Sequence, residues 1–501
     1  MAQRVTEAAP PSARPPTPPP PQGRVPPPLT ARSMTASASG ASAALTGHGV
    51  RAPDRVLLAA GNSPEFVAVL LGLLDLGVSV ALADPGAPAA ALTASAVEVG
   101  ADWLVTDRPT APGAPRTIPL ADAAGDAGGA LADPDLVRWT ARADGLISWS
   151  SGSTGAPKAV VRAGAAIEGN LARTADRMGY RADDVLAPLL PFSHQYGMSM
   201  VLLARRAGCG LLVAPARLDR ALPALAEHGV TVVDATPVTF RSALNLLARK
   251  EGLVDALTGV RMWCTGGAPL GDELARRFTE VTGAPLLDGY GSTELGNVAL
   301  AGPGAPDTCL PLAGLSVRVL DERGAPAPPG VIGRVWVDSP DTASGVLADG
   351  VLVPRPPGPQ HTHDLGLLDE RGGLRVIGRE RAVARRGHTL YPDRLAHLAG
   401  ACGAPVQVVP LPRGEDDWRL VFVVEDPRLT AAAWWRARFG EVLARHELPD
   451  RVLVVAELPR LPSGKTDLVR VTDIVRSADT STGQDAERAA SRGHRTGRAL
   501  P

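Results

Sequence analysis

The chain has 501 residues, enough for more than one domain with a large buried core. Its 52 acidic and 51 basic residues nearly cancel, so no overall field marks it as a partner of nucleic acid or of an anionic membrane. Its four cysteines, Cys209, Cys264, Cys309 and Cys402, lie far apart and form no CxxC pair. This spacing gives no zinc signature and argues against a disulfide framework, so we expect a cytoplasmic protein.

The first segment is dominated by proline. Residues 1–30 contain PPSARPPTPPPPQGRVPPP and lack the apolar core of a secretory signal. This composition predicts a disordered leader, which we extend over residues 1–45, with a proline-binding docking tail as the alternative. Met34 is an alternative start of translation within this segment.

From residue 55 the sequence alternates between predicted strands and helices. RVLLAA predicts a strand, and Ser63 followed by Pro64 predicts the start of a helix through EFVAVLLGLLDLG. A strand over VSVALAD, a helix over residues 88–99 and a strand over DWLVTD follow. The apolar stretch FVAVLLGLLDLGVSVALA is broken by Asp75, so we interpret it as a buried helix and strand and predict no membrane span.

The alternation resumes after Gly145. AAIEGNLARTADRMG predicts a helix, and the predicted strands are LISWS, DVLAPLL, LLVAP, TVVDAT and VRMWCT. Such alternation implies a largely parallel sheet covered by helices. From about residue 314, SVRVLDERG and GRVWVDS predict a small β-rich subdomain. We therefore predict an α/β fold with a large N-terminal domain of layered αβ sheets plus this subdomain, over residues 46–379.

A smaller domain follows the large one. Over residues 380–475, RLVFVVED and RVLVVAEL predict strands that flank a helix around Trp434, which indicates an α+β domain. Residues 476–501 are polar and basic and predict a disordered tail. The sequence contains no internal repeat.

A run of hydroxyl residues and glycines, SWSSGSTGAPK over residues 148–158, follows one of the predicted strands. A glycine-rich turn there can bring backbone N–H groups and hydroxyls close to a phosphate, although a polar surface loop is the plain alternative. The run does not match the P-loop G-x-x-x-x-G-K-[ST], and PSGKTD at 462–467 fails too because Pro459 stands where the first glycine belongs.

The run instead resembles the phosphate loop of the adenylate-forming superfamily, which includes acyl- and aryl-CoA synthetases, peptide-synthetase adenylation domains and firefly luciferase. Four further blocks resemble that family in the same order: TGGAPL (265–270), GYGSTELG (289–296), HTHDLG with GRERAVARRG (361–387), and LPRLPSGKTD (458–467). The resemblance covers about residues 50–472. It implies two domains, the smaller of which is a mobile lid.

The resemblance also implies roles for single residues. It implies that ATP is bound by Ser150, Ser151, Gly152, Ser153, Thr154, Gly155, Lys158, Gly267, Ala268, Tyr290, Gly291, Asp364 and Arg379. In this reading, Tyr290 stacks on adenine while Asp364 and Arg379 hold the ribose. The implied catalytic residues are Lys465, Thr293, Glu294 and His194. Thr293 would bond the α-phosphate, Glu294 would hold Mg²⁺, and Lys465 would bridge carboxylate and α-phosphate.

The sequence departs from the family pattern around the predicted hinge. His363 stands where the family usually has glycine, and Arg381 stands at the hinge, usually Asp or Lys. Gly387 would line a channel for the thiol. The pair His361 and His363 also resembles the start of a metal site, but Leu365 and Gly366 stand where a binuclear hydrolase needs Asp and His.

The predicted acid pocket contains His194, Gln195, Tyr196, Gly266 and Gly267. His194 lies in PFSHQYGM, which resembles the P-x-x-H-x-x-G block of acyl- and aryl-CoA ligases, whereas amino-acid-activating domains have an aspartate there. The resemblance therefore favours a small carboxylic acid without an α-amino group. A histidine that caps a helix is the structural alternative.

The expected reaction is ATP-dependent formation of an acyl-adenylate, followed by transfer to a pantetheine thiol. The acceptor is coenzyme A or the phosphopantetheine of an acyl or peptidyl carrier protein, and the cofactors are ATP and Mg²⁺. One alternative is a stand-alone enzyme that loads an acyl or amino acid onto a carrier protein. Another is a catalytically silent family member that only binds ligand.

Overall fold

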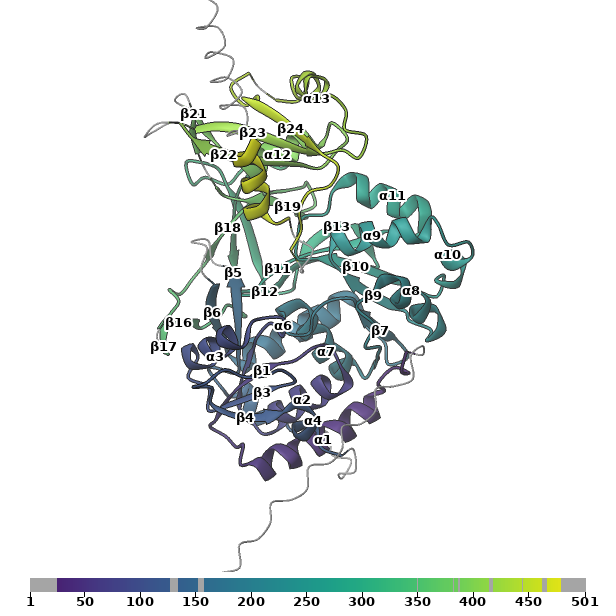
Figure 1. Ribbon diagram of the computed structural model, residues 1–501, viewed down its shortest axis with the longest axis vertical. Helices are drawn as coiled ribbons and strands as arrows, with labels where there is room; N and C mark the ends of the chain where they lie inside the picture. Colours follow the sequence, from purple (N-terminus) through teal and green to yellow (C-terminus); the bar gives the residue numbers. More distant parts are fainter. Residues whose placement is uncertain are drawn as a thin grey trace, which may run out of the picture.

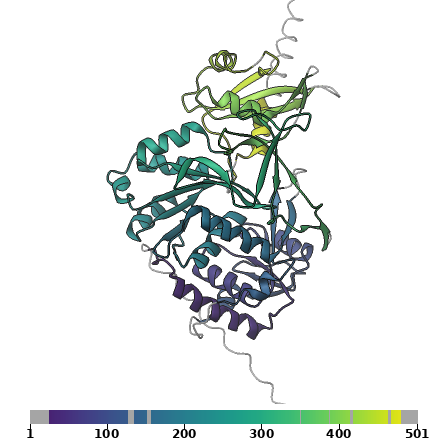
Figure 2. The same ribbon diagram turned by 180° about the vertical axis from the view of Figure 1, so that it is seen from behind.

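The computed structural model describes residues 25–126, 134–151, 157–348, 350–381, 383–385, 388–413, 418–443, 445–461 and 466–478. These residues form a large body with a smaller C-terminal lobe at one end, as both views show (Figures 1 and 2). The outer leader (1–24) and the outer tail (479–501) lie outside the described residues.

Two large sheets build the body. The first has the strand order β17 (Val351–Pro354), β16 (Gly345–Ala348), β6 (Pro157–Arg162), β5 (Leu146–Ser151), β2 (Ser79–Leu82), β1 (Arg55–Ala59), β3 (Trp103–Thr106) and β4 (Arg116–Pro119). The second has the order β13 (Ala305–Pro311), β12 (Gly296–Gly302), β11 (Leu286–Ser292), β10 (Met262–Gly266), β9 (Val232–Ala235), β7 (Val185–Pro188) and β8 (Gly210–Leu211). Strands β5, β2, β1, β3 and β4 pair in parallel, as do β11, β10, β9, β7 and β8, which confirms the prediction of largely parallel sheets.

Helices fill the space between the sheets and cover their outer faces. The main apolar cluster joins residues of both sheets to α1 (Ala31–His48), α2 (Pro64–Asp75), α6 (Gly164–Met178) and α7 (Gln195–Ala207). The outer face of the second sheet is covered by α8 (Leu218–Glu227), α9 (Pro237–Leu247) and α11 (Asp272–Thr282), whereas α3 (Ala89–Glu98) covers the first sheet. Shorter helices are α4 (Leu120–Ala124), α5 (Val137–Thr140) and α10 (Leu253–Ala256).

The predicted helix starts follow from local chemistry. The Ser63 side chain accepts a hydrogen bond from the Phe66 N–H, and Pro64 occupies the first turn of α2, as the sequence predicts. The residues of α2 from Phe66 to Leu74 are all buried, and so are those of β2. The long apolar stretch is therefore a buried helix followed by a buried strand. Among the described residues, no helix has the length and apolarity needed to cross a bilayer.

The predicted leader is too long. We expected disorder up to residue 45, but Ala31–His48 form α1, which is capped by Thr30 and buries Met34 and Leu45. Leu29 also pairs with Leu211 of β8. The helix is rich in alanine, serine and glycine, whose small side chains allow close packing against Gly72 of α2. Linkers often have the same composition of small residues, so the sequence analysis did not identify this helix.

The β-rich subdomain and the C-terminal lobe follow the predicted order. A four-stranded sheet contains β14 (Ser316–Leu320), β15 (Gly333–Asp338), β18 (Gln360–Leu368) and β19 (Leu374–Arg379). The lobe contains β20 (Val383–Arg385), β21 (His388–Leu390), α12 (Pro392–Gly400), β22 (Val406–Pro412), β23 (Trp418–Glu425), α13 (Ala432–Phe439) and β24 (Arg451–Val455). A last helical stretch over residues 468–478 runs past our predicted start of the tail at 476.

Candidate active site

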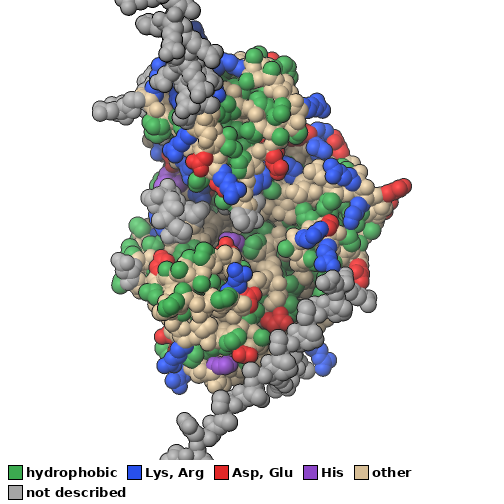
Figure 3. All heavy atoms as spheres, in the orientation of Figure 1, with side chains coloured by type: hydrophobic (Ala, Val, Ile, Leu, Met, Phe, Trp, Pro, Cys, Tyr) green, Lys and Arg blue, Asp and Glu red, His purple; other side chains and the backbone are tan. Residues whose placement is uncertain are grey.

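A hollow of about 2320 Å³ lies where the second sheet, the β-rich subdomain and the C-terminal lobe meet. Figure 3 shows the surface indented between the lobe and the body. Its walls include the ends of β5 and β6, the start of α7, the carboxyl ends of β9–β11, and residues of β18 and β19. Ligands of parallel α/β sheets bind at the carboxyl ends of strands, so this is the expected place for a site.

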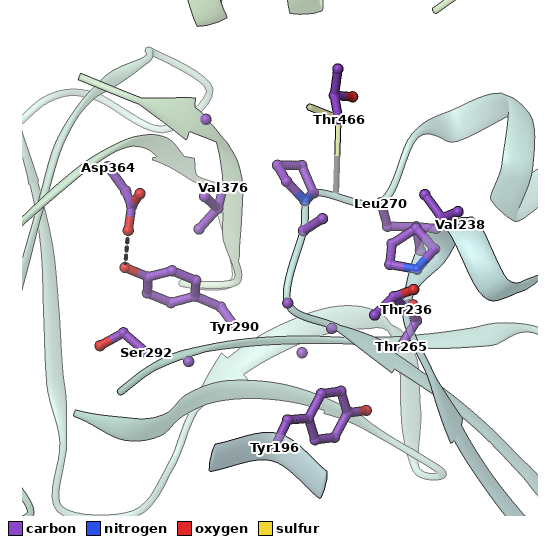
Figure 4. A pocket seen from close by; sticks show the side chains of 18 of the residues that line it. Tyr196, Thr236, Val238, Thr265, Leu270, Tyr290, Ser292, Asp364, Val376 and Thr466 are labelled. Carbon is purple, nitrogen blue, oxygen red and sulfur yellow. Dashed lines mark hydrogen bonds between the residues drawn. The ribbon is translucent and has the colours of Figure 1, made fainter. Parts of the chain in front are cut away.

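Tyr290 and Asp364 form a polar pair on one wall of the hollow (Figure 4). The Tyr290 hydroxyl donates a hydrogen bond of 2.5 Å to Asp364 Oδ2. The register of β18 and β19 places Asp364 opposite Arg379, whose Nε lies 3.2 Å from Asp364 Oδ1. Burial raises the pKa of Asp364, although Arg379 and the Tyr290 hydroxyl oppose that rise. The resemblance assigns all three residues to the binding of one nucleotide, and the structure brings them together.

Gly291, Thr293 and Glu294 line the same hollow where the chain turns from β11 to β12. Glu294 is close enough to raise the pKa of both Asp364 and the buried Arg162 electrostatically. Burial outweighs that effect on Arg162 and lowers its pKa to about 10. The Glu294 carboxylate, which lies near the Tyr290–Asp364 pair, is a suitable oxygen ligand for a hard cation such as Mg²⁺.

The predicted phosphate loop joins β5 to β6. In this hairpin Ser150 pairs with Lys158 and Ser151 pairs with Pro157, and both Ser150 and Lys158 line the hollow. Gly152, Ser153, Thr154 and Gly155 lie outside the described residues. The predicted loop is thus attached to two strand ends that face the hollow.

The predicted acid-pocket residues come from the start of α7 and the end of β10. His194, Gln195, Tyr196, Gly266 and Gly267 all line the hollow, as does Ala268. A Cβ atom on Gly266 would lie 3.2 Å from Tyr196 Cε1, so the tyrosine ring packs directly against the backbone of β10. Gly267 has a φ of 80°, a left-handed conformation that favours glycine. His194 occupies the N-cap position of α7, but its side chain makes no capping hydrogen bond.

The region of the predicted hinge contains a cluster of side chains that the sequence showed only in part. His363 has a φ of 59°, a conformation that glycine adopts more easily, which explains why the family usually has glycine at this position and leaves the histidine in a less favourable backbone conformation. Ligand atoms of His361, His363 and Glu380 lie within 4.8 Å of one another. Glu380 is already paired with His361 at 2.8 Å and lies 3.6 Å from Arg334. Because Arg334 repels cations, we interpret the cluster as polar contacts that hold residue 380 against β18, not as a metal centre.

Backbone contacts mark the boundary between body and lobe. The Arg381 N–H donates to the Arg379 carbonyl at 2.9 Å, and Asp393 Oδ2 of α12 accepts from the Arg379 N–H at 2.6 Å. Gly387 and Lys465 lie outside the described residues. The structure describes residues on both sides of 462–465. Arg460 and Thr466 form a β-bridge, and both line the hollow.

Asp234 is a lining residue that the sequence analysis missed. It lies on β9, is 2% exposed, and accepts a hydrogen bond of 2.9 Å from the Tyr196 hydroxyl. Burial raises its pKa to about 7. One signal was present: TVVDAT has a single carboxylate inside an otherwise apolar strand, where a charge is costly unless it has a partner.

The comparisons with known proteins all point to one family. The family model described as "AMP-binding enzyme" matches residues 28–347. The chain is 28% identical to a salicylyl-CoA synthase / salicylate adenylyltransferase from a Streptomyces species, over 89% of each chain. It is 27% identical to a 3-hydroxybenzoate–CoA/4-hydroxybenzoate–CoA ligase from Thauera aromatica, over 90% of this chain and 92% of the ligase. The fold is similar to that of ATP-bound MatB from Rhodopseudomonas palustris, with a TM-score of 0.74 at 24% identity, over 89% of this chain and 92% of MatB.

Proposed function

The chain belongs to the AMP-binding enzymes and is an AMP-forming acid–thiol ligase, and on this premise we propose that it joins a small aromatic carboxylic acid to coenzyme A. The observation that carries the proposal is that the polar pair Tyr290–Asp364 and the pocket beside Tyr196 open into one hollow. The two reactants of adenylate formation, ATP and the acid, can therefore meet in that hollow. The aromatic class is supported by the relatives, whose names refer to salicylate and hydroxybenzoate.

In this proposal Asp364 binds the ribose hydroxyls. Its Oδ1 faces Arg379 and its Oδ2 faces Tyr290, so the carboxylate is held in one orientation before nucleotide binds. Adenine lies against the Tyr290 ring and the Gly266–Ala268 turn. Thr293 contacts the α-phosphate, and Glu294 would hold Mg²⁺, which neutralises phosphate charge when bound. Ser150, Ser151, Lys158 and residues 152–155 contact the β- and γ-phosphates.

The reaction has two steps. A carboxylate oxygen of the acid attacks the α-phosphorus, the bond to pyrophosphate breaks, and an acyl-adenylate forms. The Lys465 ammonium group stabilises the negative charge that develops on the carboxylate and α-phosphate oxygens. A pantetheine thiolate then attacks the acyl carbon, and the bond to AMP breaks with release of the nucleotide. The thiol passes its proton to solvent before the attack, which leaves the thiolate as the nucleophile.

The second step uses a movement of the C-terminal domain, which we place over residues 380–475. Rotation about Arg381 would replace the Lys465 segment by the segment around Gly387, which then lines the thiol channel. Such hinge movements use a few residues at the ends of elements. The position of Arg381 directly after the Asp393–Arg379 contact supports this choice of hinge.

The substrate is tested by pyrophosphate exchange with the full chain. Aromatic, fatty, small dicarboxylic and amino acids are offered separately with MgATP, and we expect exchange with aromatic acids. Intact-mass analysis of coenzyme A and of a phosphopantetheinyl carrier protein then identifies the acceptor. Exchange with amino acids alone would contradict the assignment of His194, transfer only to the carrier would replace coenzyme A, and no exchange with any acid would indicate a silent binding protein.

Lys465 is tested by replacement with alanine. We expect Lys465→Ala to reduce adenylate formation by about 10²–10³, because one preorganised donor in a transition state stabilises it by roughly 3–4 kcal/mol. ATP binding, measured by calorimetry, is expected to persist. Lys250→Ala is the matched control, since Lys250 is an exposed lysine just beyond the end of α9 that contacts the Asp219 carbonyl. Near-normal exchange by Lys465→Ala refutes its assigned role.

A further inference from the structure

The acid pocket ends at a buried carboxyl group. Asp234 is the third residue of β9, all four residues of which are buried. It pairs in register with Pro188 of β7 and Cys264 of β10, so its immediate neighbours on the sheet are apolar. Its side chain points to the face that carries α7, because its Oδ1 accepts from the Tyr196 hydroxyl of that helix at 2.9 Å. The carboxyl group therefore lies deep behind the tyrosine that lines the predicted pocket.

The hydrogen bonding of this carboxyl group is incomplete. Asp234 Oδ2 is buried and has no partner among the described residues. Burial is the main influence on its pKa, and the Tyr196 hydroxyl opposes it. Tyr180 and Cys264 also lie near Asp234, and burial keeps the pKa of each well above its ordinary value, so both side chains stay uncharged. A buried acceptor without a partner is unfavourable, and native proteins normally satisfy such groups.

A ligand bound in the pocket would lie next to the side chain that lacks this donor. Asp234, Tyr196 and Cys264 all line the hollow that contains the Tyr290–Asp364 pair. The reacting carboxylate of the acid cannot be the group that meets Asp234, because two carboxylates in a desolvated site repel each other. The contact must come from another part of the acid, such as a substituent on its ring.

We propose that Asp234, oriented by the Tyr196 hydroxyl, recognises an amino or hydroxyl group on the acid, at a position away from its reacting carboxylate. The inference rests on the proposed function, because it assigns the substrate class of the same site. An acid that presents an apolar group to Asp234 leaves Oδ2 without a hydrogen-bond donor. We therefore expect a lower kcat/KM for such an acid. Amino and hydroxyl groups share the chemistry that matters here, an N–H or O–H aimed at a carboxyl oxygen.

The test compares acids that differ only in this donor. Pyrophosphate exchange is measured with the full chain for the hydroxybenzoates, the aminobenzoates and the corresponding methylbenzoates, whose methyl group has nearly the same size. We expect at least one hydroxyl or amino isomer to exceed its methyl counterpart by about 10–100-fold in kcat/KM, the usual cost of an unpaired buried group. Equal use of methyl and donor-bearing isomers would overturn the proposal, since water would then satisfy Asp234.

Two variants separate recognition from folding. Asp234→Leu removes the acceptor, so the donor-to-methyl ratio is expected to fall to one or below while use of methylbenzoates rises. Asp234→Asn keeps the shape of the side chain and adds an N–H₂ donor, so methoxybenzoates are expected to gain relative to hydroxybenzoates. Asp255→Asn, at an exposed aspartate of α10, should leave the ratio unchanged. An equal loss for all acids in both Asp234 variants contradicts recognition.

The outcomes also distinguish this inference from the proposed function. If fatty or amino acids support exchange while no benzoate does, the aromatic substrate class is wrong. If benzoates support exchange but methyl and donor-bearing isomers do so equally, the ligase assignment stands and only the role of Asp234 fails.

Discussion

The Tyr290 hydroxyl has a specific task at the residue scale, which is to hold Asp364. Asp364 is buried, and a buried carboxylate needs donors to keep a single orientation. Tyr290 provides one at 2.5 Å and Arg379 provides a cation at 3.2 Å. The family resemblance assigned Tyr290 to adenine, whereas the hydroxyl contact adds a positioning role that ring stacking alone does not require.

Tyr290→Phe tests this positioning role. Phenylalanine keeps the ring and removes only the hydroxyl, so we expect the KM for ATP to rise about 10-fold, the equivalent of a hydrogen bond to a charged group at roughly 1.5 kcal/mol. The maximal rate of adenylate formation should change less. Tyr391→Phe is a control, because Tyr391 lies at the start of the lobe. An unchanged KM would show that Arg379 suffices to orient Asp364.

Asp234 also predicts a pH dependence of stability. Its folded-state pKa of about 7 lies above the ordinary value of 3.8, so the folded chain binds this proton more tightly than the unfolded chain. The native state therefore loses stability as pH rises from about 4 to about 7, by at most roughly 4 kcal/mol, and the loss is constant above that window. Tyr196, Tyr180 and Cys264 stay protonated in this range because burial raises the pKa of each.

Asp234→Asn removes this penalty, so its stability relative to the parent chain should increase from pH 5 to pH 8. Urea unfolding at pH 5, 6, 7 and 8 measures the difference, in which all other titrating groups cancel. Asp255→Asn is expected to show a difference that does not vary with pH. A flat difference for Asp234→Asn would mean that the carboxyl group has a normal pKa.

At the residue scale, some contacts of the candidate site could be predicted from the sequence and others could not. The Asp364–Arg379 pair was predictable because both residues lie in one block of the resemblance and in adjacent strands. Asp234 was not, because its partner Tyr196 lies on another element, and only the tertiary fold brings strand β9 to helix α7. Glu380 was missed for the same reason, since its contacts with His361 and Arg334 depend on the pairing of three strands.

At the scale of the secondary-structure elements, contacts with α2 hold α1 in place. The Ser42 hydroxyl donates a hydrogen bond to Asp75 Oδ2 at 2.7 Å, and its oxygen also lies 3.2 Å from the Gly72 carbonyl oxygen. A Cβ atom on Gly72 would lie 2.9 Å from Ala41 Cβ and 2.9 Å from the Ser42 nitrogen, too close for either neighbour to remain in place. The absence of a side chain at Gly72 therefore sets the distance between α1 and α2. Elements with strong caps or apolar periodicity were predictable, whereas α1 depends on this close approach and not on hydropathy.

Gly72→Ala tests the close approach of the two helices. Helix propensity alone would stabilise α2 by up to about 1 kcal/mol, but the contact with the α1 backbone should reverse the sign. We expect a lower melting temperature, equivalent to a loss of about 1–3 kcal/mol. Gly47→Ala is the matched control, because Gly47 lies in α1, where an added Cβ would meet nothing within 4 Å, and should be neutral or stabilising. A stabilised Gly72→Ala chain would show that α1 can move away from α2 without cost.

At the scale of the whole molecule, polar contacts between described residues join the lobe to the body. Asp393 of α12 accepts from the Arg379 N–H, and Arg241 of α9 lies close enough to Glu425 and Arg460 of the lobe for both to influence its pKa. Burial lowers the pKa of Arg241 and so does Arg460, whereas Glu425 raises it. Polar contacts of this kind exchange readily with water, which suits the rotation of the lobe that we propose between the two steps.

Arg381→Pro tests whether the chain rotates at the proposed hinge. Proline fixes φ near −65° and removes the N–H that Arg381 donates to the Arg379 carbonyl at 2.9 Å. If the two steps need two different backbone conformations at residue 381, a fixed φ should slow one of them selectively. We expect thioester formation to fall by at least about 10-fold relative to pyrophosphate exchange, because the described contacts of Arg460 and Thr466 with the hollow fit the adenylating arrangement.

Arg381→Ala separates the backbone effect from the side chain, because alanine retains the N–H and the freedom of φ while it removes the guanidinium group. Its two half-reactions should keep nearly the parent ratio, measured by pyrophosphate exchange and by the release of AMP on addition of coenzyme A. A proline variant with both half-reactions unchanged would place the rotation elsewhere in the chain. Equal losses in the alanine and proline variants would instead assign the effect to the charge of Arg381, which opposes the rise that burial causes in the pKa of Asp393.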